Sequence, residues 1–151
     1  MGVDLNRQML ALAKKRCSGW KQVQFVESSV CPLDISSSSI DTVVCQQGFQ
    51  FFENKEKAAR EIYRVLRGGG KIIATTWRPV AECQFFGVIC EALNEIGEPE
   101  ISDIMRVPFD FLTESELAEP FALAGFDNVR LEKQQLDLVL EGGAAQGLEV
   151  A

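Results

Sequence analysis

The sequence predicts an α/β fold in which helices cover a mostly parallel sheet. Segments with strand-like alternation recur between segments with helical periodicity, an order typical of parallel strands joined by helical crossovers. The segment 40–45, Ile-Asp-Thr-Val-Val-Cys, is rich in β-branched residues, which predicts a strand buried on both faces. Two alternating segments near the carboxyl end, 129–131 and 136–140, predict a hairpin that adds an antiparallel edge.

The first elements predicted are a strand that ends near Asp4 and a helix that Asn6 caps. The helix should end at Ser18-Gly19 and be followed by a strand at 23–26 and a serine-rich loop at 28–39. Its apolar residues recur at the spacing of one buried helix face, and they are Leu5, Met9, Leu12 and Ala13.

A second amphipathic helix is predicted to start at Asn54, and the three glycines at 68–70 should end it before a strand at 71–76. Because these glycines follow a helix and precede a strand, they are not a phosphate-binding loop, which has the reverse order. The inward residues of the helix are Ala58, Ile62, Val65 and Leu66. On its solvated side, opposite charges lie four residues apart in two pairs, Glu56 with Arg60 and Lys57 with Glu61.

The third part of the chain predicts further helices. The pattern at 81–96 is helical, and the segment 97–108 is expected to be a less regular lid. A capping box that starts at Thr113 predicts a helix that runs to Gly125, and Pro120 should kink or split it. Together the elements predict one incomplete domain over residues 1–140, followed by a frayed, glycine-rich tail at 141–151.

Composition excludes several classes of function. The net charge is −7 and the 15 basic residues are scattered, which argues against nucleic-acid binding. The sequence has neither a long apolar run nor the pattern of a secretory leader, so no membrane span is predicted and a cytoplasmic location is expected. Five cysteines without a CxxC pair, and the absence of histidine, predict no metal site and a reducing compartment.

Four stretches of the sequence follow one another over residues 2–140, namely GVDLNRQMLALAKKR, VQFVESSVCPLDISSSSIDTVVCQQGFQFF, REIYRVLRGGGKIIATTW and AGFDNVRLEKQQLDLVL. In content, order and spacing they resemble the class I S-adenosylmethionine-dependent methyltransferases, in the group related to ubiquinone and menaquinone biosynthesis methyltransferases. The resemblance implies a Rossmann-like three-layer sandwich. It also implies S-adenosylmethionine as cofactor, a small-molecule methyl acceptor, and methyl transfer that depends on positioning rather than on a particular catalytic side chain.

The resemblance places the ribose contact of the cofactor at Asp4, since a carboxylate has two acceptor oxygens for the two hydroxyls of a cis-diol. Leu5 would pack on the adenine. Two alternatives for Asp4 stay open: an acid near a helix dipole, or the ribose ligand of a nicotinamide-dependent dehydrogenase. The dehydrogenase does not fit the terminal hairpin or the glycines at 68–70.

Three further residues are implied at the cofactor. Ser29 stands where the family has an acid that meets the adenine amino group, and backbone groups near Val30 would carry more of this recognition. Gln46 ends the strand at 40–45 and would face the methionine part, while the run 46–52 lines the acceptor side. The alternatives are that Ser29 is an ordinary loop serine and that Gln46 is a polar strand-end residue that caps the next loop. Four aromatic residues could wall the acceptor pocket or form core, and they are Trp77, Phe85, Phe86 and Phe109.

The family's first strand lies in the sheet between its second and fourth strands and leads into a glycine-rich turn at the cofactor. The sequence begins inside the second strand, so a gap in the sheet is expected. Unpaired main-chain groups along it would cost about 1 to 3 kcal/mol each if buried. The strands could close up, another chain could fill the gap by self-association, or the gene product could start upstream, which is favoured. An inactive or weakly active fragment, or a non-catalytic interaction module, are the functional alternatives to a methyltransferase.

Overall fold

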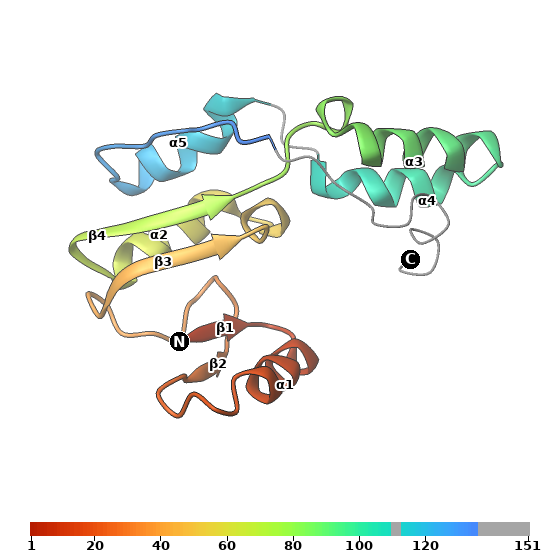
Figure 1. Ribbon diagram of the computed structural model, residues 1–151. Coiled ribbons are helices and arrows are strands. Elements are labelled where there is room, and N and C mark those ends of the chain that lie inside the picture. Colours follow the sequence, from red (N-terminus) through yellow and green to blue (C-terminus); the bar gives the residue numbers. More distant parts are fainter. Residues whose placement is uncertain (110–112, 136–151) are drawn as a thin grey trace.

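A computed structural model describes residues 1–109 and 113–135 (Figure 1). It contains strands, helices and short 3₁₀ turns (η) that alternate along the chain. In order they are β1 (Gly2–Asp4), α1 (Arg7–Arg16), β2 (Phe25–Glu27), β3 (Ile40–Gln46), η1 (Phe49–Phe51), α2 (Lys55–Val65), β4 (Leu66–Thr75), η2 (Val80–Glu82), α3 (Gln84–Glu95), α4 (Pro99–Arg106), η3 (Val107–Phe109) and α5 (Glu114–Ala124).

The four strands form two parallel pairs instead of one continuous sheet. β1 pairs with β2, with Val3 opposite Val26, and β3 pairs with β4, with Val44 opposite Ile73. No ladder joins β1 to β3 in the part of the chain that the structure describes. The separation falls where a gap in the sheet was predicted, and in the described residues β1 and β3 do not close up against each other (Figure 1).

The core lies on one face of the β3–β4 pair, under α2 and α5. Phe49 and Phe121 stack there with ring centroids 4.7 Å apart. Ala58 and Ala59 of α2 complete this cluster and are fully buried. Ile62 and Val65 are buried farther along the same helix, which confirms the predicted inward face of α2.

The opposite face of the β3–β4 pair is open. Val44 is 70% exposed and Ile73 is 53% exposed, so the prediction that the strand at 40–45 is buried on both faces is wrong. The physical reason is that α2 and α5 cover one face only, and no described element covers the other (Figure 1).

The predicted inward face of α1 is also largely wrong. Asn6 caps the helix as expected and accepts hydrogen bonds from the Gln8 and Met9 N–H groups. Leu10 is the residue of this helix that is buried, whereas Leu5, Met9 and Leu12 are exposed. The apolar periodicity identified a helix correctly, but it could not show that the described neighbours cover only the side that carries Leu10.

The chain leaves α2 earlier than predicted. The helix ends at Val65, and the glycines at 68–70 lie within β4. A Cβ atom on Gly70 would lie 2.9 Å from the Arg67 carbonyl oxygen and 3.2 Å from that of Asp41, so close backbone approach requires this glycine. The glycines are therefore structural, as predicted, although they do not cap the helix.

The segment predicted as a lid is regular, since it contains α4, which packs against α3. The fully buried Ser102 hydroxyl donates to the Cys90 carbonyl oxygen at 3.0 Å and ties the two helices together. α5 runs without a break through Pro120 to Gly125, whose φ of 104° is left-handed. Residues 129–131 form no strand. The partner strand at 136–140 and the tail at 141–151 lie outside the described residues.

Candidate functional site

The carboxyl ends of β1 and β3 lie on the same side of the molecule (Figure 1). Asp4 is the last residue of β1, and Gln46 is the last residue of β3. In open parallel sheets, ligands bind outside the carboxyl ends of the strands. The structure therefore places these two predicted cofactor residues at the edge where a ligand is expected, on separate strand pairs.

Asp4 is exposed and has one oxygen engaged within the chain. Its Oδ1 accepts a hydrogen bond from the Asn6 N–H group at 2.7 Å. The other carboxylate oxygen has no hydrogen-bond partner among the described residues. This arrangement orients the carboxylate and leaves acceptor capacity for a ligand hydroxyl. The same contact also fits the alternative in which Asp4 supports the start of α1.

The residues predicted to contact adenine differ in how available they are. Leu5 is 71% exposed and offers an apolar surface beside Asp4. The Ser29 hydroxyl is used locally, since it accepts from the Cys31 N–H at 3.1 Å and donates to the Cys31 carbonyl at 3.3 Å. Val30 packs against the core cluster. The serine hydroxyl is thus engaged within its own loop.

The turn after β3 is fixed by unusual backbone geometry. Gln46 is exposed and lies opposite Thr75 in the ladder. Gln47 has a φ of 51°, and its N–H donates to the Thr75 carbonyl at 3.0 Å. A Cβ atom on Gly48 would lie 3.1 Å from the Cys45 sulfur. Positive φ is uncommon for a residue with a side chain and is often found at functional sites.

Two glutamines in this turn have buried polar atoms without partners. Within the described residues, Gln47 Oε1 and both amide atoms of Gln50 are buried and have no hydrogen bond. Each such group costs about 1 to 3 kcal/mol when it stays unpaired. The prediction from the sequence places the run 46–52 on the acceptor side and does not single out Gln47 and Gln50. The sequence shows that three glutamines occur there among aromatic residues, but whether their amides are paired depends on the fold.

The four predicted aromatic residues pack on one another, and Trp77 also lines a small cavity of about 170 Å³. Phe86 is central, with ring centroids 5.4 Å from Trp77 and 4.9 Å from Phe109. Phe85 lies 5.3 Å from Phe86. Phe109 is 4% exposed. The cluster joins α3 and η3 to the segment that follows β4, and it fits the core alternative better than a pocket wall.

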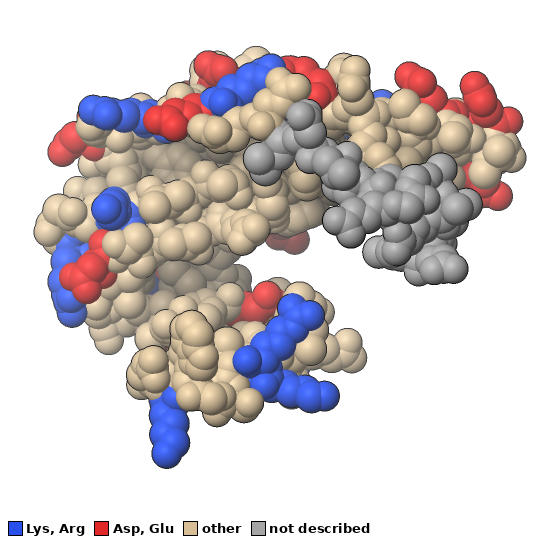
Figure 2. Space-filling view, viewed as in Figure 1, with Lys and Arg blue, Asp and Glu red and all other residues tan. Residues whose placement is uncertain are grey.

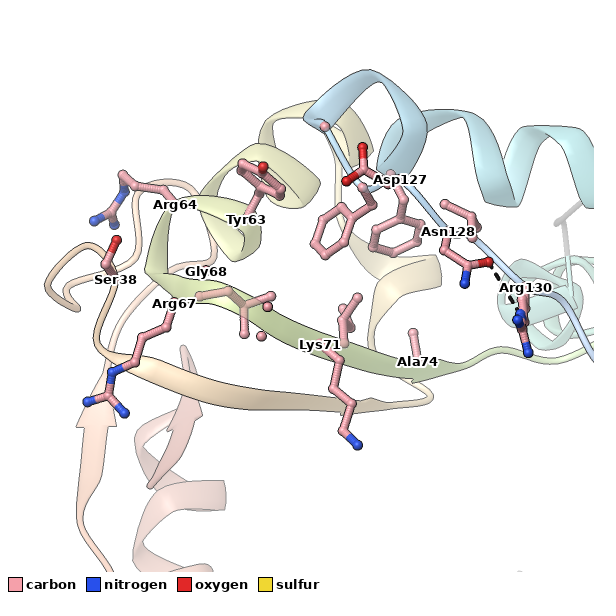
Figure 3. Close-up of a pocket in the computed structure, with 18 of the residues that line it drawn as sticks. Ser38, Tyr63, Arg64, Arg67, Gly68, Lys71, Ala74, Asp127, Asn128 and Arg130 are labelled. Carbon is pink, nitrogen blue, oxygen red and sulfur yellow. Dashed lines mark hydrogen bonds between the residues drawn. The ribbon is translucent and has the colours of Figure 1, made fainter.

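A cavity lies elsewhere, at the edge of β4 that faces away from β3. It measures about 850 Å³ and is bounded by β4, α5 and residues 125–131. Figure 3 shows Arg67 and Lys71 projecting away from its interior, toward the side opposite α5. None of the predicted cofactor residues lines it. Because its interior is not at the carboxyl ends of the strands, we do not assign the cofactor to this cavity.

Charge is distributed in separate patches. Figure 2 shows basic side chains over the part that contains α1 and mixed charges along the upper edge, without a continuous basic band between them on this face. Burial raises the pKa of the Cys45 thiol, which opposes a nucleophilic role beside Gln46. Among the described residues, no cluster of side chains could hold a metal ion. No described helix is long and apolar enough to cross a membrane.

Comparisons with known proteins agree with this geometry. A family model described as "Methyltransferase domain" matches residues 1–74, which include β1, β3 and most of β4. The demethylmenaquinone methyltransferase of Deinococcus radiodurans is 30% identical over 125 residues, which are 80% of this chain and 51% of that protein. A methyltransferase of Aspergillus fumigatus, tpcH, is 28% identical over 151 residues, or 94% of this chain and 53% of its own.

A solved structure shares the fold. It is an S-adenosylmethionine-dependent methyltransferase from Thermotoga maritima, described as a possible histamine N-methyltransferase. Its TM-score is 0.60 at 23% identity, with 85% of this chain and 55% of that chain covered. The chain thus spans about half the length of the relatives it matches. The comparisons thus show a Rossmann-like fold, and residues 1–74 are similar to the methyltransferase domain.

Proposed function

We propose that the protein that carries this chain transfers a methyl group from S-adenosylmethionine to a small-molecule acceptor. The observation that carries the proposal is the open oxygen of Asp4 at the carboxyl end of β1, on the same side as Gln46 and inside the family match. Two of the relatives' names, demethylmenaquinone methyltransferase and 2-methoxy-6-polyprenyl-1,4-benzoquinol methylase, support a quinol as the acceptor.

The residues present fit this cofactor at its nucleoside end. Asp4 would accept hydrogen bonds from the ribose hydroxyls, while the exposed Leu5 would contact the adenine. The main chain near Ser29 and Val30 would meet the base, and Gln46 would face the methionine part. When bound, S-adenosylmethionine supplies the electrophilic methyl group. The chain's own contribution is to hold the donor and to orient the acceptor, and no catalytic residue is assigned.

Binding of S-adenosylhomocysteine by calorimetry tests the proposal, on the full protein and on the 151-residue chain. Asp4→Ala should weaken binding by about tenfold to a hundredfold, since it removes charge-assisted hydrogen bonds to the ribose. Asp103→Ala, which removes an exposed carboxylate on α4, is the control and should bind normally. Equal affinity of wild type and Asp4→Ala would overturn the proposal.

The split between β1 and β3 favours a second candidate, an interaction module that pairs through these open edges. We propose that the chain self-associates at these edges. A rise in sedimentation coefficient with protein concentration would support this, and a constant monomer mass would refute it.

If the 151-residue chain binds no S-adenosylhomocysteine while the full protein does, the chain alone is inactive. The cytoplasmic location stays a prediction from composition.

A further inference from the structure

We propose that the amides of Gln47 and Gln50 are the hydrogen-bonding groups that hold a hydroxyl of the methyl acceptor. The inference rests on the proposed function and adds the residues that select the acceptor. Its basis is the set of three buried, unpartnered amide atoms in the turn that follows Gln46. Buried amides in native structures are almost always paired, so this turn carries unused hydrogen-bonding capacity.

The backbone of the turn is anchored on both sides of Gly48. Gln47 is anchored through its N–H to the Thr75 carbonyl and hydroxyl oxygens, at 3.0 and 3.3 Å. Phe49, the first residue of η1, is fully buried and stacks on Phe121 of α5. The backbone on either side of Gly48 is thus fixed to β4 and to the core, which fixes the main-chain positions from which the two amides extend.

The position of the turn favours the acceptor over the cofactor. The turn begins one residue beyond Gln46, the residue proposed to face the methionine part of the donor. Its η1 segment contacts η3, which carries Phe109 of the aromatic cluster. Phe51, next to Gln50, is 56% exposed and offers an aromatic ring to a flat ligand. A ligand at these amides would therefore lie between the donor residues and an apolar aromatic surface.

The chemistry of the amides indicates a neutral hydroxyl. A glutamine amide both donates and accepts, and so does a phenolic or quinol hydroxyl, whereas a carboxylate needs donors only. No charged side chain among the described residues forms a hydrogen bond to either amide. The acceptor class that fits is an uncharged aromatic ring that bears a hydroxyl group, in agreement with a quinol.

Gln50→Leu separates this role from a structural one. The probe is 1,4-naphthoquinol under reducing conditions, with S-adenosylmethionine as donor and the full protein as enzyme. Gln50→Leu should raise KM for the quinol by about tenfold, because the ring loses a neutral hydrogen bond that the wild type supplies. Its affinity for S-adenosylhomocysteine should not change. Its thermal midpoint should stay level or rise, because the variant buries a methyl-bearing side chain where the wild type leaves an amide unpaired.

Two further variants complete the test. Gln47→Asn keeps an amide, and asparagine tolerates the left-handed backbone better than glutamine does. The shorter side chain moves the amide away from the ligand, so KM should rise without loss of stability. Gln22→Leu makes the same substitution at an exposed turn residue and should leave both constants unchanged.

Two outcomes would overturn the inference. One is a wild-type protein that neither binds nor methylates the naphthoquinol while it still binds S-adenosylhomocysteine. The other is a Gln50→Leu variant with unchanged KM for the quinol, which would mean that the amide serves no ligand. Failure of S-adenosylhomocysteine to bind the wild type would instead refute the proposed function.

Discussion

Two units of the same design differ sharply in how well they are packed. In residues 40–75, β3 and β4 share a ladder that runs from Ile40 to Gln46, and α2 buries four of its residues. In residues 1–27, the β1–β2 ladder has three pairs, and α1 buries Leu10 alone within the described structure. In the proposed donor site, Gln46 lies in the well-packed unit and Asp4 lies in the poorly packed one. The two halves of the site are therefore held in place by unequal amounts of packing.

Side-chain networks reinforce the difference. Arg64 of α2 donates to the Ile35 and Leu33 carbonyl oxygens at 2.9 and 3.0 Å, and it pairs with Glu61 at 2.7 Å. Glu61 in turn accepts from the Leu33 N–H at 2.8 Å, so the loop before β3 is fastened to α2. The first unit has an Arg7–Glu27 ion pair whose side chains are 83% and 43% exposed, and such pairs contribute little.

Truncation of a buried side chain in α2 should have the largest effect. Ile62 is 3% exposed, so Ile62→Ala should lower the free energy of unfolding by about 2 to 5 kcal/mol. Leu12→Ala, the matched truncation in α1, should change it by less than about 0.5 kcal/mol, since Leu12 is 43% exposed. Urea unfolding followed by far-ultraviolet circular dichroism measures both. Equal losses for the two variants would contradict the proposed difference between the units.

The two asparagine caps allow a comparison with the residue type held constant. Asn54 accepts from the Lys57 N–H at 2.8 Å, and Asn6 accepts from the Gln8 N–H at 2.8 Å. Asn54→Ala should lower the global unfolding free energy by about 1 kcal/mol. Asn6→Ala should leave the global midpoint nearly unchanged and speed amide hydrogen exchange in α1 only, because that helix opens locally. Hydrogen exchange read residue by residue, beside a urea midpoint for each variant, would show whether α1 opens independently.

Much of the local structure was predictable from the sequence. The caps at Asn6 and Thr113, the helix start at Asn54 and the helix end at Gly125 are confirmed because they depend on hydrogen bonds within a few residues. Pro120 does not split α5, which is one helix with this buried proline inside it.

The sequence could not show which faces of the helices and strands are covered by another element. An apolar pattern gives the side of an element that can be buried, and it does not say whether another element is there to bury it. Val44 and Leu12 were therefore predicted as core and are exposed. In the site, the strand-end positions of Asp4 and Gln46 were predictable. The unpaired amide of Gln50 was not predictable, because it depends on tertiary contacts.

The smallest expected effect concerns pH and the Arg64–Glu61 pair. Hydrogen bonding from Arg64 lowers the pKa of the Glu61 carboxyl below its ordinary value of 4.5, and the Leu33 N–H acts in the same direction. A carboxyl group with a lowered folded-state pKa stabilises the fold above its unfolded-state pKa and loses that contribution as pH falls through the folded-state value. Wild type should therefore lose stability below about pH 4.5 more steeply than Glu61→Gln does. Near neutral pH, Glu61→Gln should be less stable than the wild type.

Glu56→Gln is the control. It removes the exposed partner of Arg60 on the same helix, where the ion pair spans 3.6 Å, and it should keep the acid slope of the wild type. Thermal midpoints between about pH 3 and pH 7 give the comparison, and identical slopes for wild type and Glu61→Gln would show that the pair does not couple the loop to α2.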